Sequence, residues 1–167
     1  MISNLFKSLR LTIAFCLFFS VFYIFVLWLF AQVAGPNKGN AELVTLNGKV
    51  VGAANVGQNF TQDIYFWGRP SHAGDGYDAS SSAGSNKGPS NEEHLALASS
   101  SGLDPHISPK AAYVQAKRVA DARGWSEEKV ITIVNSHVEK PLLGMFGTEK
   151  VNVLKLNVAL DKAAENK

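Results

Sequence analysis

The class of this protein is decided by one apolar stretch, residues 11–34, which reads LTIAFCLFFSVFYIFVLWLFAQVA. Its 24 residues include no Asp, Glu, Lys, Arg or His, and the clearly polar members are Thr12, Ser20 and Gln32. A bilayer core about 30 Å thick needs roughly 20 helical residues at about 1.5 Å each. The stretch is therefore predicted to form a single transmembrane helix.

A cleaved secretory signal is the main alternative for this stretch. The apolar core of such a signal is usually about 7 to 15 residues long and ends at a small-x-small cleavage site. Neither Ala31 nor Ala34 has a small residue two positions before it, since those positions hold Leu29 and Gln32. The length and the flanks therefore favour a helix that stays in the membrane.

The charges around the stretch predict its orientation. Lys7 and Arg10 precede it, whereas the first cation after it is Lys38. Positively charged flanks stay in the cytoplasm. We therefore expect the chain to divide into a cytoplasmic tail, a span and a soluble domain on the outer side, at residues 1–10, 11–34 and 35–167. In a Gram-negative bacterial cell the span would lie in the inner membrane and the domain in the periplasm.

The remaining composition limits the partners and cross-links. The formal net charge of +2 comes from Lys7 and Arg10, because the other 14 lysines and arginines balance 14 acidic residues. Nucleic-acid binders concentrate basic residues on one face, so a nucleic acid partner is not expected. Cys16 is the only cysteine, so the soluble domain has no internal disulfide. Lipid attachment at Cys16 is disfavoured, because Phe15 stands where such sites have a small residue.

Strands are predicted in the first part of the soluble domain. Residues 43–51 form two apolar runs around Asn47-Gly48, a pair that suits the positive φ angles of a tight hairpin turn. A third strand is predicted over 63–68, where the β-formers Ile64-Tyr65-Phe66-Trp67 are followed by Arg69-Pro70. The domain is therefore expected to begin with a short antiparallel sheet.

One helix is strongly indicated over residues 110–123. Ser108 is suited to cap its N-terminus, Pro109 to occupy its first position, and Gly124 to stop it. The residues between are good helix formers.

Further helical patterns follow this helix. A second helix is predicted over 127–138, capped by Ser126 and ended by Pro141. Apolar residues with helical spacing indicate a third over 151–160, and 161–167 are expected to fray. The sequence thus predicts an α+β chain: one N-terminal transmembrane helix, then a small soluble domain of a short antiparallel sheet and two or three packed helices.

The stretch 72–101 has a different composition, dominated by Ser, Gly, Ala, Asn and Asp. Composition alone indicates a flexible linker. A loop of this length is uncommon inside a compact domain, so it is expected to be either disordered or held against a neighbouring surface.

Conventional metal and nucleotide signatures are missing from the sequence. Gly74-Asp75-Gly76 lacks the third glycine and the strand-to-helix context of a dinucleotide loop, and no P-loop occurs. No zinc-like spacing joins any of the four histidines, which are His72, His94, His106 and His137. Neither a metal site nor self-sufficient ATP hydrolysis is predicted, and His137 is expected to be a half-buried packing residue.

Asp104-Pro105-His106 supports a hydrolase hypothesis, because a carboxylate beside an imidazole orients a general base for a serine. No G-x-S-x-G or S-x-x-K motif with its companions accompanies it. An anchored exported hydrolase therefore stays an alternative, and no residue is assigned as catalytic.

Several longer strings are distinctive, and they include Tyr65-Phe66-Trp67-Gly68-Arg69-Pro70-Ser71 and Gly84-Ser85-Asn86-Lys87-Gly88-Pro89-Ser90-Asn91. These strings resemble the C subunit of the bacterial Kdp-type potassium-transporting ATPase. The resemblance covers nearly the whole chain, and the other matching strings are residues 57–60, 101–109, 115–123 and 151–157.

The resemblance implies a small non-catalytic subunit that works with a channel-like potassium-translocating subunit and a P-type ATP-hydrolysing subunit. The chain lacks the Asp-Lys-Thr-Gly-Thr phosphorylation motif of such an ATPase and has one span where a translocation path needs several. The resemblance implies that this chain has no firmly bound cofactor and that ATP contact is possible through the complex.

Two roles for such a subunit remain open. The positive-inside argument favours an exported domain that supports assembly and the potassium entrance, whereas the family is also described as a catalytic chaperone that assists ATP binding. Polar and glycine residues of the resembling strings, including the loop 69–91, are candidates for partner contact or loop ordering: Gln58, Asn59, Arg69, Pro70, Ser71, Asn86, Gly88, Asn91, Asp104 and His106.

Overall fold

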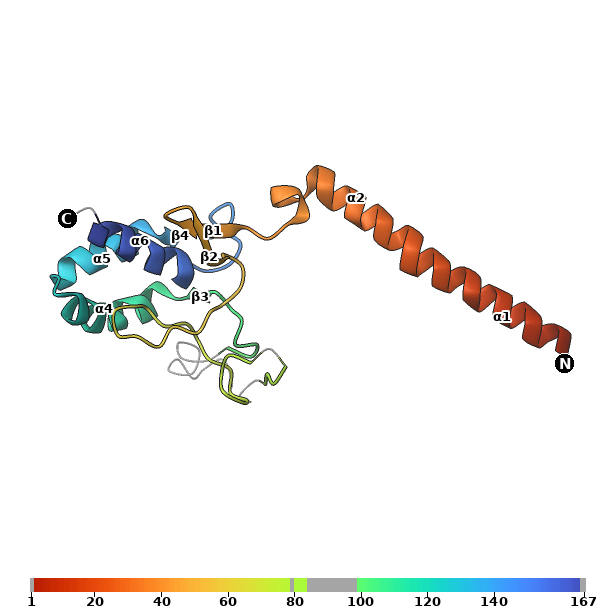
Figure 1. Ribbon diagram of the computed structural model, residues 1–167, viewed down its shortest axis with the longest axis horizontal. Helices are drawn as coiled ribbons and strands as arrows, with labels where there is room; N and C mark the ends of the chain where they lie inside the picture. Colours follow the sequence, from red (N-terminus) through yellow and green to blue (C-terminus); the bar gives the residue numbers. More distant parts are fainter. Residues whose placement is uncertain (1, 79, 84–98, 166–167) are drawn as a thin grey trace. The chain divides into compact units, whose positions relative to one another are not determined.

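The computed structural model describes residues 2–78, 80–83 and 99–165. The chain separates into two compact units, Met1–Glu42 and Leu43–Lys167 (Figure 1).

The first unit is one long apolar helix. It consists of α1 (Ile2–Leu17), a π-helical segment (Phe18–Tyr23) and α2 (Ile24–Ala34). Within the described residues, Ser3–Ala34 is the one helix long and apolar enough to cross a membrane, with a mean hydropathy of 2.6. The helix begins at Ile2, so the residues before the apolar stretch are helical too. A short 3-10 turn, Pro36–Gly39, follows it.

The second unit opens with the predicted hairpin. Strand β1 (Leu43–Leu46) pairs antiparallel with β2 (Lys49–Ala53). Asn47 and Gly48 form the turn with φ of 51° and 74°, the positive angles that this pair adopts at low cost. The hairpin prediction is confirmed.

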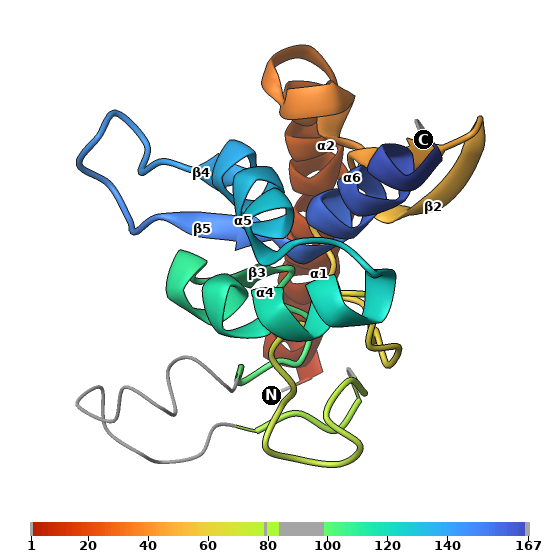
Figure 2. The same ribbon diagram turned by 90° about the vertical axis from the view of Figure 1, so that its left-hand side faces the viewer.

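A separate antiparallel sheet has the strand order β3-β5-β4 (Figure 2). Its strands are β3 (His106–Ile107), β4 (Val138–Glu139) and β5 (Lys150–Asn152). The α+β class is confirmed, but the expected order of strands first and helices afterwards is wrong. Strands of two or three residues carry no recognisable period, and tertiary pairing with β5 determines them.

Helix α4 (Pro109–Arg123) confirms the predicted helix and both its ends. The Oγ atom of Ser108 accepts a hydrogen bond from the N–H of Ala111 at 3.1 Å. Gly124 closes the helix in the left-handed conformation, with φ of 64°.

The two later helices differ from their predicted limits. Helix α5 (Glu127–Ser136) ends before Val138, which belongs to β4 and pairs with Val151 of β5. Helix α6 (Val153–Glu165) starts after that strand and stays helical where fraying was expected. Asp161 explains the continuation, because its carboxylate pairs with Arg123 at 2.8 Å.

Helix α4 packs against α5, and α5 packs against α6. Strand β5 lies against α4 and α6 (Figure 2). The buried core combines small residues of α4 with branched residues of α5, β5 and α6. Its members are Phe66, Ile107, Ala112, Ala116, Val119, Ala120, Val130, Val134, Val151, Val153, Leu156 and Leu160.

Candidate functional site

The segment around Phe66 and Trp67 is the framework of the candidate site, and the strand predicted over 63–68 is wrong. Asn157 of α6 accepts a hydrogen bond from the N–H of Phe66 at 2.8 Å and donates to its carbonyl at 3.0 Å. Gln115 of α4 bonds to Trp67 in the same way, at 2.9 and 3.2 Å. Two side-chain amides thus satisfy the backbone groups that a neighbouring strand would otherwise pair.

Two arginines fix the turn that precedes this segment. Arg118 donates to the carbonyls of Asp63 and Tyr65 at 2.7 and 3.0 Å. Arg123 donates to the carbonyl of Ile64 at 2.7 Å. Because the arginines lie on α4, the turn is held to that helix by charge-assisted hydrogen bonds.

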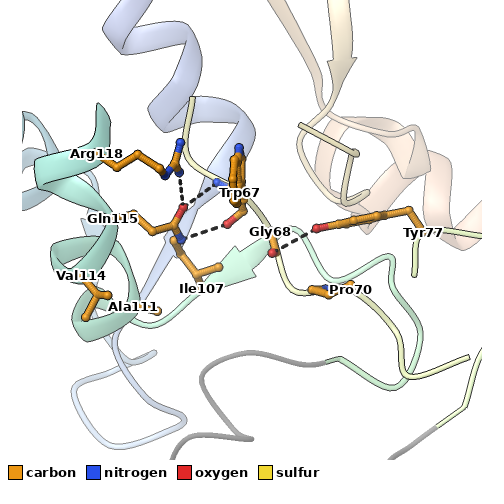
Figure 3. Close-up of a pocket in the computed structure, with 9 residues that line it drawn as sticks. All are labelled: Trp67, Gly68, Pro70, Tyr77, Ile107, Ala111, Val114, Gln115 and Arg118. Atoms are coloured by element: carbon orange, nitrogen blue, oxygen red, sulfur yellow. Dashed lines mark hydrogen bonds between the residues drawn. The ribbon is translucent and has the colours of Figure 1, made fainter. Parts of the chain in front are cut away.

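A cavity of about 490 Å³ opens between this segment and α4 (Figure 3). Most of its wall is aromatic or aliphatic, and Gln115 and Arg118 supply its polar side chains. The guanidinium of Arg118 lies 3.9 Å from the centroid of the Trp67 ring, so it covers one face of the indole. The cavity is lined by Trp67, Gly68, Pro70, Tyr77, Ile107, Ala111, Val114, Gln115 and Arg118.

A second polar cluster joins Arg69, Asp104 and His106. Arg69 forms an ion pair with Asp104, whose other oxygen accepts the backbone N–H of His106 at 3.0 Å. The imidazole Nδ1 of His106 lies 3.4 Å from Asp104, and its Nε2 lies 3.9 Å from Glu139. The structure therefore brings three of the predicted site residues together.

Burial and charge act differently on the two titrating groups of this cluster. Burial by itself raises the pKa of Asp104, but the hydrogen bond from His106 N–H and the charge of Arg69 outweigh it, so this pKa lies below its ordinary value. Burial lowers the pKa of His106, and Lys150 lowers it further, against the opposing effect of the carboxylates. Both groups thus favour their deprotonated forms.

The hydrolase hypothesis gains no support from this geometry. Within the described residues, the ring nitrogens of His106 face the carboxylates of Asp104 and Glu139, and no serine hydroxyl is hydrogen-bonded to them. A general base needs such a partner to activate a nucleophile. Asp104 and His106 instead connect the loop before β3 to the sheet.

Ser71 organises the start of the Ser/Gly-rich stretch. Its Oγ accepts hydrogen bonds from the N–H groups of Ala73 and Ala83 at 3.2 and 3.1 Å. The same hydroxyl lies 3.2 Å from the carbonyl of Ser100. The buried hydroxyl of Ser71 therefore connects the segment at Ala73 and Ala83 to the segment at Ser100.

The other predicted residues have different positions. Pro70 lines the cavity. Gln58 packs against β2, where its Nε2 lies 3.5 Å from the carbonyl of Val51. Asn59 is exposed. Three further predictions fall outside the described residues, and these are Asn86, Gly88 and Asn91.

Among the residues that line the cavity, sequence reasoning selected Pro70 and not the others, and it also missed Asn157, which binds the backbone of Phe66. Asn157 had a usable signal, because it is an amide on the apolar face of α6, beside Val153, Leu154 and Leu160. A buried polar residue at such a position requires a hydrogen-bond partner. Nothing in the sequence pointed to Phe66 as that partner, since the two are 91 residues apart.

Comparison with known proteins now identifies the family. The family model for KdpC, described as "K+-transporting ATPase, c chain", matches residues 5–97 and 93–162. The chain belongs to the KdpC family. The match confirms the resemblance and covers both the apolar helix and the soluble domain.

Relatives within the KdpC family agree with this assignment. A potassium-transporting ATPase KdpC subunit of Bacteroides thetaiotaomicron is 64% identical, with 95% of this chain and 98% of the relative aligned. One of Flavobacterium psychrophilum is 44% identical over the same shares. One of Caulobacter vibrioides is 47% identical over 78% of this chain and 79% of the relative.

The first prediction concerns Asn157, whose side-chain amide pairs with the backbone of Phe66 in place of a neighbouring strand. Asn157→Leu should lower the free energy of unfolding by roughly 2–6 kcal/mol, because two buried backbone groups of Phe66 lose their partners at about 1–3 kcal/mol each. Urea unfolding of the full chain in detergent, followed by tryptophan fluorescence, measures the change. Asn59→Leu is the matched control and should change it by at most about 0.5 kcal/mol. Equal effects of the two substitutions would contradict the assignment.

The second prediction concerns acid stability. A carboxyl with a lowered pKa in the folded state stabilises the fold above its unfolded pKa, and this contribution is lost as the pH falls through the folded pKa. Asp104→Asn should therefore be less stable than the parent chain at pH 7. The difference should shrink as the pH falls below about 4. A difference that is constant between pH 7 and pH 3 would contradict the prediction.

Proposed function

We propose that this chain is a non-catalytic accessory subunit of an ATP-driven potassium uptake complex. In this proposal, the surface around the cavity between Trp67 and α4 docks onto a partner subunit. The docking supports assembly of the complex and the shape of the potassium entrance. The proposal rests on family membership together with one feature of the site, which is that its polar groups are already used to hold the protein's own backbone.

That feature favours docking over catalysis. Gln115 and Tyr77 bond to backbone groups of the segment that forms the cavity wall, and Arg118 bonds to the turn that precedes it. Asp104 pairs with Arg69, and Ser71 holds its own loop. Side chains committed in this way make a rigid and largely apolar shape. Such a shape suits a protein surface better than a reaction that needs a mobile proton or nucleophile.

The rim of the cavity offers apolar contact area. Val114 of α4 is 79% exposed although it is aliphatic, and the exposed ring of Trp67 lies at the opposite wall. Exposed apolar groups beside a preformed cavity are typical of a binding surface. We propose the channel-like potassium-translocating subunit as the partner at this surface, with the P-type ATP-hydrolysing subunit as a further member of the complex.

The proposed orientation follows from the charged residues around the span. Lys7 and Arg10 precede the apolar core of the helix, and basic flanks stay in the cytoplasm. The unit Leu43–Lys167 would then face the periplasm, on the side from which potassium enters. The chain would be a single-pass protein of the inner membrane, with lipid as a further contact of its helix.

Direct nucleotide handling is the competing role, and one observation together with the proposed orientation opposes it. One face of Trp67, the ring on which an adenine would stack, is covered by the guanidinium of Arg118. A periplasmic domain would also not meet cytoplasmic ATP. We therefore propose that any effect on ATP affinity arises through coupling across the complex, with ATP not bound by this chain.

The third prediction tests the orientation in intact spheroplasts with a membrane-impermeant maleimide. In a Cys16→Ser background, Ser81→Cys should be labelled without lysis, because Ser81 belongs to the periplasmic unit. Ser8→Cys is the matched control on the other side of the span and should be labelled only after lysis. The reverse pattern would contradict the proposed orientation and make direct ATP contact the leading mechanism.

The fourth prediction tests the docking surface. Val114→Arg should reduce co-purification of the partner subunits in detergent at least about tenfold, because an unpaired charge at an interface costs about 2–5 kcal/mol. Val50→Arg is the matched control, since Val50 is also an exposed valine but lies on β2. Equal recovery of partners with both variants would exclude this surface as the docking site.

A further inference from the structure

The loop between β4 and β5 carries an exposed apolar tip, formed by Leu142, Leu143, Met145 and Phe146. These side chains are 71%, 78%, 75% and 62% exposed. Figure 2 shows the loop projecting away from the helices of its unit. Four neighbouring large apolar side chains in water mark an interaction surface, whereas single exposed apolar residues do not.

The backbone of this tip forms a hydrogen-bonded turn, and its geometry is costly for the residue at its apex. Leu143 and Gly144 have φ of 54° and 73°, nearly the values of Asn47 and Gly48 in the first hairpin. Asparagine adopts positive φ with little strain, whereas a leucine does so at a cost. The chain thus places a large apolar side chain at an apex where a polar residue would fit better. Strain of this kind points to a function for the apex side chain.

Four backbone N–H groups of the tip are hydrogen-bonded within the loop. Leu142 and Phe146 exchange N–H to carbonyl hydrogen bonds, both at 3.0 Å. The N–H groups of Gly144 and Met145 donate to the carbonyls of Pro141 and Leu142, at 3.0 and 3.2 Å. A segment that enters lipid must pair its backbone internally, because acyl chains offer no hydrogen-bond partners. The tip pairs these four N–H groups before it binds anything.

The chain keeps this tip close to a bilayer. Residues 35–42 connect the apolar helix to the second unit, and eight residues extend at most about 29 Å. A domain of about 125 residues has a radius of gyration of about 14 Å. Every part of its surface is therefore within reach of the membrane that holds the helix. Such tethering makes even a weak insertion effective, because the second contact is intramolecular.

We propose that the apolar tip inserts its side chains into the interfacial region of the bilayer, among lipid acyl chains, in the leaflet that the second unit faces. Phe146 and the two leucines supply the apolar contact. Lys140 and Lys150 flank the tip in sequence, and Glu139 and Glu149 balance their charge, so the apolar side chains account for the insertion. The second unit is then held at the membrane at two places, by its tether and by the tip.

The inference is separate from the proposed docking surface. The tip lies on β4–β5, whereas the cavity lies between α4 and the segment at Trp67. Insertion requires only that the apolar helix spans the bilayer, and it holds for either orientation. A test on the chain alone in vesicles can therefore fail without affecting the docking proposal.

The experiment measures how deeply the tip enters the bilayer. The full chain with Cys16→Ser and Leu143→Cys, labelled with an environment-sensitive fluorophore, is reconstituted into phosphatidylcholine and phosphatidylglycerol vesicles. Val114→Cys is the matched control, because Val114 is 79% exposed and Leu143 is 78% exposed in the same unit. Part of the phosphatidylcholine is then replaced by phospholipid with a nitroxide on its acyl chain.

The fluorophore at position 143 should show blue-shifted emission and lose most of its intensity to the nitroxide lipid. The fluorophore at position 114 should keep water-like emission and its intensity. Adding Met145→Ser and Phe146→Ser to the Leu143→Cys chain should abolish the quenching, because the remaining tip is too polar to insert. Loss of quenching in this variant, with unchanged emission at position 114, supports insertion by the tip itself.

Two results would overturn the proposal. Equal quenching at positions 143 and 114 would show that proximity alone brings the fluorophores to lipid. An unquenched fluorophore at position 143 that becomes blue-shifted only after co-reconstitution with the other subunits would identify a protein, and not lipid, as the occupant of the tip.

Discussion

The peptide groups of Phe66 and Trp67 are paired with the side-chain amides of Asn157 and Gln115 instead of with a second strand. The packing of the second unit depends on these contacts. They bring α4 and α6 to a segment that is otherwise irregular, and they let the ring of Phe66 enter the core completely. Because buried backbone groups must be paired, a segment held in this way cannot move without breaking several bonds together.

The candidate site is a consequence of this arrangement. With the segment fixed, its next residues form one wall of the cavity and the exposed face of α4 forms the other. Arg69 then forms an ion pair with Asp104, and the hydroxyl of Ser71 donates a hydrogen bond to the carbonyl of Ser100, which lies at the other end of the Ser/Gly-rich stretch. The site is accordingly a rigid shape made by structural hydrogen bonds.

The two units use apolar surface for different purposes. In the long helix, apolar side chains point outward on every side, as a lipid environment requires. In the second unit, apolar residues are mostly buried, whereas the tip of the β4–β5 loop exposes four large apolar side chains. Leu143 in that tip and Asn47 in the first hairpin have nearly the same positive φ. Asn47 adopts this angle with a polar side chain, whereas Leu143 exposes an apolar one.

Local rules were sufficient for the elements whose signals lie within a few residues. The apolar helix follows from an unbroken hydrophobic run, α4 from Ser108, Pro109 and Gly124, and the first hairpin from Asn47-Gly48. The family, too, was recognisable from ordered strings along the chain, and the KdpC match confirms it. Among the candidate residues, Arg69, Asp104 and His106 were selected from sequence and do lie together.

The tertiary structure decided everything that depends on partners far apart in the chain. Residues 63–68 have the composition of a strand, yet no strand lies beside them, since Asn157 and Gln115 occupy the pairing positions. Val138 and Val151 have helical neighbours in sequence but pair with each other in the sheet. The sequence by itself therefore determined the long apolar helix, the capped helix and the family. Only the fold decided the cavity, the ion-pair cluster and the exposed tip, because each requires burial and hydrogen-bond partners that local sequence does not contain.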